Sequence, residues 1–222
     1  MQPVTPVVHI LPHWNWNAGD SMPIWVFSNA DEIELFVNGA SQGRKAMPVY
    51  SHVEWDGIPF VPGSLHAVAY KNGTSAPAAE QFVNTTGPSA ALRIYVKDGL
   101  WAGQLVAGCA DATSVAVDVL DAAGRVNPLA ADVVTFAIAG DAALAGTSNG
   151  DPACLTNNKA TTRAAFHGKL VAVVLGGSAA GTVTVTASAP GLAPVSIDIP
   201  QVAPPAGWSA AWCHTNPTIP VA

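Results

Sequence analysis

The sequence predicts an all-β protein built from two tandem β-sandwich domains. Half of its 222 residues are apolar and only 11% are charged, so the chain can bury sizeable cores. Its 20 glycines and 18 prolines supply the frequent turns that separate short strands. One strand-like alternation ends in an Asn-Gly turn, and a polar Gly-Pro cluster divides the chain between two series of short periodic segments. These observations indicate antiparallel strands rather than helices.

The segment from Val26 to Gly43 carries the clearest strand signal. Apolar side chains alternate with glutamates, and successive side chains of a strand point to opposite faces. The core-facing set is Ile33, Leu35 and Val37. Asn38-Gly39 follows, a dipeptide that readily adopts the positive φ angles of a type I′ turn. We therefore expect a β-hairpin that returns through Ala40–Lys45.

The first domain is expected to cover residues 1–86. Val7–Ile10 ends shortly before Pro12, which cannot donate to a ladder, so this segment is expected to form an edge or first strand. Further strands are expected at Ile24–Phe27, Ile33–Val37, Ala40–Lys45, His52–Trp55, Leu65–Tyr70 and in a segment that ends near Val83.

The cluster Asn84–Ser89 is expected to join the first domain to a second one over residues 87–200. About seven short strands with regular turns are typical of an immunoglobulin-like sandwich. The expected strands are Leu92–Val96, Ser114–Leu120, Val133–Ile138, Thr162–Phe166, Leu170–Leu175, Thr182–Ala187 and Val195–Ile199. The fold class is thus all-β, with two tandem immunoglobulin-like β-sandwich domains. Residues 201–222 form a Pro-rich tail that either lies across the sandwich surface or is a linker toward a further domain, and we favour the first for Trp208 and Trp212.

Three segments of the first domain are similar to a known family. They read VVHILPHWNW at residues 7–16, NADEIELFVNGASQG at residues 29–43 and PGSLHAVAYKNG at residues 62–73. Together they resemble the region that follows the catalytic barrel in many bacterial β-galactosidases of glycoside hydrolase family 2. The less specific segments VAVDVLDAAG (residues 115–124) and NGDP (residues 149–152) resemble the immunoglobulin-like domain that comes next in that family.

The resemblance implies a non-catalytic, C-terminal ancillary region of a β-galactosidase-like glycoside hydrolase. Its partners would be the catalytic barrel and the other domains of a parent enzyme. Family 2 enzymes are retaining glycosidases, which need two carboxyl groups about 5–5.5 Å apart. In the family these glutamates belong to the barrel, and the present chain lacks the alternation of strands and helices that a barrel requires. We therefore expect no catalytic residues; the fallback carboxylates are Glu32, Glu34, Glu54 and Asp56, which we interpret as solvated strand faces.

Aromatic residues of the first domain are the candidates for carbohydrate or interdomain contact. Flat rings beside amide and carboxylate groups can stack on sugar rings and bind their hydroxyls. The candidate set is His13, Trp14, Asn15, Trp16, Trp25 and Trp55. The favoured interpretation is that Trp14 and Trp16 pack against the barrel, while Trp25 and Trp55 lie in the core of their own domain.

Charge and hydropathy exclude several other classes of protein. The net charge is −6, and the nine Lys and Arg residues are scattered, so nucleic acid is not an expected partner. No apolar run approaches the roughly 20 residues of a membrane span, and Met1-Gln2-Pro3 does not open a signal peptide. We expect a soluble chain cut from something longer; secretion or periplasmic export as part of a longer protein stays open.

Metal and cofactor sites are not expected. His9 and His13 are four residues apart, but Pro12 between them excludes the helix on which that spacing would place both on one face. Cys109, Cys154 and Cys213 form no C-x-x-C pair. Buried or unpaired thiols are preferred over a single disulfide with one free thiol.

Two functional hypotheses follow. The first is the ancillary region of a larger glycosidase, with carbohydrate contact as an additional property. The second is an autonomous small carbohydrate-active or sugar-binding protein, acting on β-galactosides or related glycans. A parent gene that encodes the sugar-binding and barrel domains upstream of Val7 would favour the first.

Overall fold

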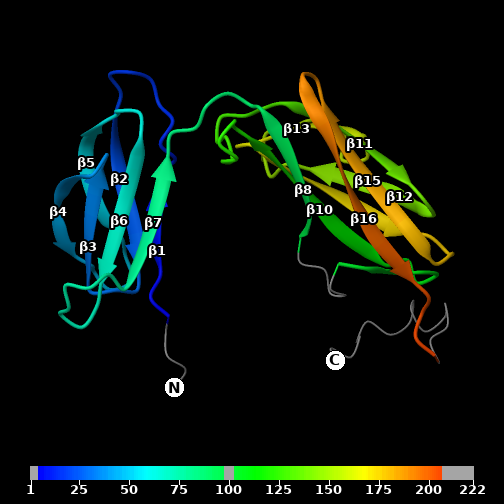
Figure 1. The fold of residues 1–222 in the computed structure, drawn as a ribbon, viewed down its shortest axis with the longest axis horizontal. Helices are drawn as coiled ribbons and strands as arrows, with labels where there is room; N and C mark the ends of the chain where they lie inside the picture. Colours follow the sequence, from blue (N-terminus) through cyan, green and yellow to red (C-terminus); the bar gives the residue numbers. More distant parts are fainter. Residues whose placement is uncertain (1–4, 98–102, 207–222) are drawn as a thin grey trace. The chain divides into compact units, whose positions relative to one another are not determined.

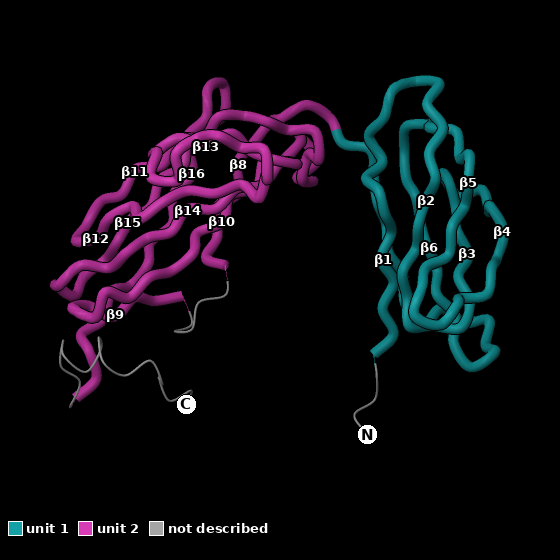
Figure 2. Tube along the Cα trace, turned by 180° about the vertical axis from the view of Figure 1, so that it is seen from behind, with its two compact units in different colours: residues 1–86 teal, residues 87–222 magenta. Residues whose placement is uncertain are grey.

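The computed structural model describes residues 5–97 and 103–206, and every regular element among them is a β-strand, which confirms the predicted fold class. The chain divides into two compact units, Met1–Thr86 and Gly87–Ala222 (Figure 2). Each unit is a sandwich of two sheets (Figure 1). The described residues contain no apolar helix of the length that a bilayer crossing demands.

The first domain pairs a three-stranded sheet, in the order β1-β2-β5, with a four-stranded sheet, in the order β4-β3-β6-β7. All neighbouring strands in both sheets are antiparallel. The strands are β1 (Val8–Leu11), β2 (Ser21–Ser28), β3 (Glu32–Val37), β4 (Ala40–Ala46), β5 (Val53–Pro59), β6 (Ser64–Tyr70) and β7 (Ala79–Asn84). The strand before Pro12 is an edge strand, as expected.

The core of the first domain lies between these two sheets. The predicted alternation of β3 holds, because Ile33 and Leu35 are fully buried while the glutamates between them point outward. Asn38 and Gly39 adopt φ angles of 48° and 82°, as the predicted hairpin turn requires. The buried set of this core is Ile10, Trp14, Ile24, Val26, Ala30, Ile33, Leu35, Val53, Trp55, Ile58, Leu65, Ala67 and Ala69.

Two side-chain bonds connect the edge strands β4 and β5. The indole of Trp55 donates to the carbonyl of Gln42 at 3.1 Å, and the ammonium of Lys45 donates to the carbonyl of Glu54 at 2.7 Å. These bonds occupy groups that an edge strand would otherwise offer to another chain. They also join the rims of the two sheets.

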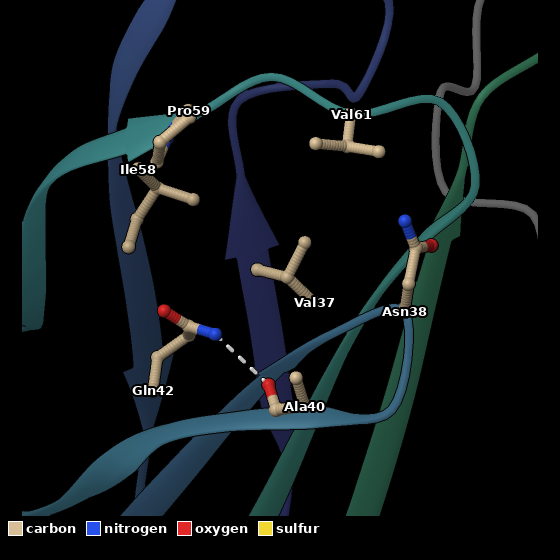
Figure 3. A pocket seen from close by; sticks show the side chains of 7 residues that line it. All are labelled: Val37, Asn38, Ala40, Gln42, Ile58, Pro59 and Val61. Atoms are coloured by element: carbon tan, nitrogen blue, oxygen red, sulfur yellow. Dashed lines mark hydrogen bonds between the residues drawn. The ribbon is translucent and has the colours of Figure 1, made fainter.

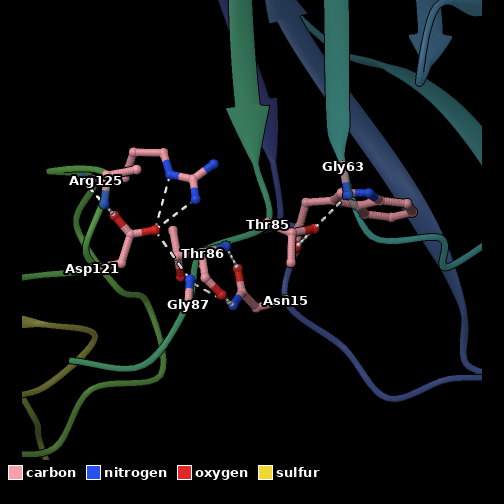
Figure 4. A network of polar contacts seen from close by, with 9 residues as sticks. Asn15, Gly63, Thr85, Thr86, Gly87, Asp121 and Arg125 are labelled. Atoms are coloured by element: carbon pink, nitrogen blue, oxygen red, sulfur yellow. Dashed lines mark hydrogen bonds and ion pairs between the residues drawn. The ribbon is translucent and has the colours of Figure 1, made fainter. Parts of the chain in front are cut away.

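The residue that ends the first domain is held by Asn15. The Asn15 amide nitrogen donates to both the carbonyl and the hydroxyl of Thr86 at 3.0 Å, and its oxygen accepts the Thr86 amide at 3.0 Å (Figure 4). Thr85 donates its hydroxyl to the Trp14 carbonyl at 2.7 Å and accepts the Gly63 amide at 3.1 Å. The side chain of Asn15 thus acts like a strand partner for the last residue of its domain.

The second domain consists of nine strands among the described residues, rather than the expected seven. The strands are β8 (Ala91–Lys97), β9 (Leu105–Val106), β10 (Ala112–Leu120), β11 (Val133–Ala139), β12 (Ala142–Ser148), β13 (Thr162–Ala164), β14 (Lys169–Gly176), β15 (Gly181–Ala189) and β16 (Leu192–Val202). The sequence analysis missed β9 and β12. The first has only two residues, and the second is rich in Ala and Gly, which have low strand propensity.

The sheets of the second domain have the orders β12-β14-β10-β8 and β13-β11-β15-β16-β9, and they enclose a core of valine, leucine, alanine and phenylalanine side chains. Strand β9 pairs with β16 in parallel, whereas the other pairs are antiparallel. The last strand includes Gln201 and Val202, so the sandwich extends into the region expected to be tail. Trp208 and Trp212 lie outside the described residues.

Asp121 organises the start of the second domain. Its carboxylate is almost fully buried and accepts the Arg125 guanidinium at 2.7 and 3.0 Å, together with the backbone amides of Ala123, Arg125 and Gly87 (Figure 4). The bond from the Arg125 side chain is the chief reason that the pKa of Asp121 lies well below its usual range. Burial opposes this shift but does not outweigh the hydrogen bonds.

Replacing Leu35 by alanine should destabilise the first domain by about 2–5 kcal/mol, because it leaves a cavity between the two sheets. Glu34→Ala removes only surface hydrogen bonds and should cost no more than about 1 kcal/mol. Chemical denaturation followed by Trp fluorescence and circular dichroism measures both. Equal losses in the two variants would show that the assignment of faces is wrong.

Replacing Asn15 by alanine should cost about 1–3 kcal/mol, since it removes the three hydrogen bonds that the buried Asn15 side chain makes with Thr86. Asn15→Asp should also destabilise, because it exchanges the donating amide for a second oxygen that faces the Thr86 carbonyl. Asn17→Ala is the matched control, with an expected change within about 0.5 kcal/mol at this exposed position. An unchanged denaturation midpoint in Asn15→Ala would contradict the clamp.

The lowered pKa of Asp121 makes the stability of the second domain depend on pH. The folded pKa lies below the unfolded value of about 3.9, so the carboxylate stabilises the fold above about pH 4, and this contribution is lost as the pH falls through the folded pKa. Asp121→Asn should therefore be less stable than the wild type at pH 7, with the difference shrinking below about pH 4. Asp198→Asn, at an exposed position of β16, is the matched control variant. A wild-type advantage that persists undiminished down to pH 2 would contradict this account.

Candidate functional site

Trp14 is a core residue of the first domain. Its ring is fully buried, packs edge-on against Phe60 at 5.1 Å between ring centroids, and donates its indole N–H to the Val61 carbonyl at 3.0 Å. The side chain therefore offers no ring face to a sugar or to another domain. Asn15 is equally occupied, because its amide holds Thr86.

His13 and Trp16 contact each other through a ring stack and a hydrogen bond, next to these core residues. Their rings stack with centroids 4.5 Å apart, and the Trp16 indole donates to the His13 carbonyl at 2.9 Å. His13 Nδ1 also accepts a hydrogen bond from the backbone N–H of Asn15 at 3.2 Å. Trp16 is half-buried and packs against the core cluster. Trp14 and Asn15 of the HWNW segment thus serve the folding of their own domain, whereas His13 and Trp16 are half-buried.

Trp25 and Trp55 lie on opposite faces of the same sheet. Trp55 is buried, as expected, but Trp25 is 40% exposed, although the sequence interpretation placed it in the core. The reason is the register: Ile24 faces Trp55 and Trp25 faces Glu54, and directly opposed residues of an antiparallel pair share a face. Because Ile24 is buried, its neighbour Trp25 must point outward.

The exposed side of the β1-β2-β5 sheet forms an aromatic surface, which we call the Trp25 face. It consists of His9, Leu11, Trp25, Phe27, His52 and Glu54. The His52 ring lies 5.0 Å from Trp25 and 5.1 Å from Phe27, and Trp25 donates its indole N–H to Glu54 at 2.7 Å. Phe27 is 38% exposed and Leu11 40% exposed. Large apolar side chains are thus presented to solvent on one flat sheet.

A shallow hollow of about 280 Å³ lies at one end of this face. Its lining is formed by Leu11, Pro12, Met22, Pro23 and Trp25, all of which have apolar side chains. A second hollow, of about 230 Å³, lies beside the hairpin turn and is lined by Val37, Asn38, Ala40, Gln42, Ile58, Pro59 and Val61. In Figure 3 the Gln42 amide bonds to the Ala40 carbonyl at the rim of the second hollow. No aromatic ring lines the second hollow, so we take the Trp25 face as the candidate site.

The other outer face of the first domain is also aromatic, but its groups are bonded to one another. The His66 ring stacks on Phe82 at 3.9 Å and on Phe36 at 5.5 Å, and its Nε2 lies 2.8 Å from Glu80. The Arg44 guanidinium covers the Tyr70 ring at 3.7 Å. This face therefore forms a closed network of ring and ion-pair contacts.

The fallback carboxylates are distributed over these two faces. Glu32 pairs with Arg44 at 2.6 Å; Glu34 accepts the Ser41 hydroxyl at 2.6 Å and the Tyr70 hydroxyl at 3.2 Å. Burial and the bond to Glu34 raise the pKa of Tyr70. Glu54 accepts the Trp25 indole, and Asp56 is exposed. Glu32, Glu34 and Glu54 thus each bond to a side chain of their own face.

The cysteines differ from one another. Cys109 is disulfide-bonded, which corrects the preference for thiols at that position, whereas Cys154 is free and Cys213 lies outside the described residues. The Cys154 sulfur accepts the guanidinium of the buried Arg163 at 3.0 Å. Hydrogen bonds from Thr156, and then from Arg163, lower the pKa of this thiol.

Sequence reasoning missed Leu11, Phe27 and His52 as members of the candidate site. The signal was present in the run MPIWVF at residues 22–27, which is apolar at every position instead of alternating. Such continuous runs are typical of strands that are covered on both faces.

Comparison with known proteins assigns both domains. Residues 102–198 match the family "Glycoside hydrolase family 2 C-terminal domain 5", and residues 19–77 match a family described as "Domain of unknown function (DUF4982)". The beta-galactosidase BoGH2A of Bacteroides ovatus is 36% identical over 188 residues, which are 84% of this chain and 21% of that protein. A beta-glucuronidase of Formosa agariphila is 33% identical over 206 residues, 87% of this chain and 19% of that protein.

Solved structures agree with these relatives. A glycosyl hydrolase family 2 member from Bacteroides cellulosilyticus has a TM-score of 0.80 with 27% identity, over 89% of this chain and 28% of its own. A beta-glucuronidase from glycoside hydrolase family 2 has a TM-score of 0.77 with 32% identity, over 89% of this chain and 20% of its own. The chain spans about a fifth of the length of the curated relatives that it matches. The chain therefore belongs to the C-terminal ancillary domains of glycoside hydrolase family 2 enzymes.

Proposed function

We propose that this chain is the structural, non-catalytic C-terminal region of a β-galactosidase-like enzyme of family 2, and that it acts through contact with the other domains of that enzyme. The observation that carries the proposal is the continuity of the similarity. The aligned region crosses from the first domain into the second and lies within relatives that are about five times longer.

The polar groups of the chain support a structural role. The sequence-predicted carboxylates each have their own hydrogen-bonding partner or lie exposed, as shown by the pairs Glu32–Arg44, Glu34–Tyr70 and Glu54–Trp25. A retaining glycosidase instead needs two carboxyl groups free to flank a scissile bond. In the HWNW segment, Trp14 is buried in the core and the Asn15 side chain is hydrogen-bonded to Thr86, so both residues stabilise their own domain.

Carbohydrate contact is a second candidate function, and one observation favours it. Trp25 presents an exposed indole whose neighbour Glu54 is a hydrogen-bond acceptor, and sugars stack on such rings while their hydroxyls bind nearby carboxylates. The hollow beside Trp25 is lined by apolar side chains, which supply no partners for hydroxyl groups. The structural role therefore has the stronger support.

The isolated chain should show no turnover of aryl β-galactosides or aryl β-glucuronides, because the candidate carboxylates Glu32, Glu34 and Glu54 are each bonded to other side chains of the fold. The measurement is release of the chromogenic aryl group by purified chain, with heat-denatured protein as the control. Hydrolysis that co-purifies with the chain and disappears in Glu34→Gln or Glu54→Gln would overturn the non-catalytic assignment.

A further inference from the structure

The two sheets of the first domain have different sequence periods. Strand β3 alternates glutamate with buried aliphatic residues, as a strand with one solvated face does. Strand β2 is apolar on both faces: Ile24 and Val26 point into the core, while Trp25 and Phe27 point out, with Leu11 of β1 opposite Trp25. The sequence of this central strand is therefore suited to burial on both sides, yet within this domain only one side is covered.

From this difference we propose that the Trp25 face is the surface through which the first domain docks onto another protein domain of its parent enzyme. The inference rests on the proposed function, since it requires that further domains belong to the same polypeptide. The proposal adds which surface of the first domain makes the contact and which residues lie at the centre of that surface. Trp25 and Phe27 lie in the central strand of the sheet, where an interface buries most surface.

The chemistry of the hollow indicates a protein partner. Its lining of Leu11, Pro12, Met22, Pro23 and Trp25 fits an apolar side chain, which would lose water without leaving a polar group unpaired. The polar groups at the centre of the face already have partners within it, because Trp25 donates to Glu54 and the His52 ring lies against Trp25 and Phe27. Aromatic anchors beside an apolar pocket are typical of the energetic centre of protein interfaces.

The length of the relatives indicates that further domains are present to act as the partner. About four fifths of each curated relative lies outside the region that this chain matches. A domain tethered in the same chain has a high effective concentration, so a moderate apolar patch is sufficient for stable contact. Interdomain surfaces of about 600–1,500 Å² are common. The opposite outer face is less suited to this role, because it carries the ion pairs Glu32–Arg44 and Glu80–His66, and charged residues are depleted at the centre of interfaces.

Hydroxyl-radical footprinting tests the docking surface directly. Oxidation rates of Trp25 and Phe27 are measured by mass spectrometry in this chain alone and in the full polypeptide encoded by its native gene. We expect protection of both residues by about fivefold or more in the full polypeptide, as for the desolvated centre of an interface. Phe82, which is 56% exposed on the other face, is the internal control and should change less than about twofold.

The remaining outcomes each overturn a different statement. Equal oxidation of Trp25 in both proteins would overturn the docking surface alone. Protection that rises with the concentration of the isolated chain would instead assign the face to a second copy, and protection that requires added galactose or lactose would assign it to carbohydrate. A native gene that encodes no further domain would overturn the proposed function and, with it, the docking partner.

A pair of variants provides a second readout. Trp25→Ser and Phe82→Ser both change an exposed ring, so the isolated chain should fold with either, as checked by circular dichroism. In the full polypeptide, Trp25→Ser should lower the melting temperature of the first domain by more than Phe82→Ser does. The same small shift for both variants would contradict a special role for the Trp25 face.

Discussion

The antiparallel pairing of β2 with β5 is the constraint on which the rest of the first domain depends. Once Ile24 is opposite Trp55 inside the sandwich, Trp25 and Glu54 must lie together outside it. A shift of one residue would exchange the two faces and bring the glutamate into the core. The pairing therefore decides at once which tryptophan fills the core and which one is available to a partner.

This division separates the side chains that stabilise the domain from those that the domain exposes. Two residues of the HWNW motif build the fold: Trp14 fills the core, and Asn15 holds the last residue of the domain. The unremarkable run around Trp25 carries the exposed aromatic surface. Membership in the ancillary domains of family 2 agrees with such a surface, because a structural region acts through what it contacts rather than through catalytic groups.

The sequence was sufficient to predict the elements whose signals are local. The alternation of Ile33 and Leu35 and the Asn38-Gly39 turn depend only on backbone geometry, and both were predicted. The outward position of Trp25 could not be predicted in the same way, because every residue from Met22 to Phe27 is apolar and either face could be the buried one. Strand β12 was missed because Ala and Gly give no strand signal of their own, and its place is set by pairing with β14.

The most direct measurement of the central claim is the size and domain content of the native polypeptide that carries this sequence. Immunoblotting of source cells with an antibody against the chain, followed by mass spectrometry of the band, supplies both. The account predicts a polypeptide several times larger than 22.6 kDa that contains the catalytic barrel of family 2. A native protein of about 22.6 kDa without further domains would contradict it.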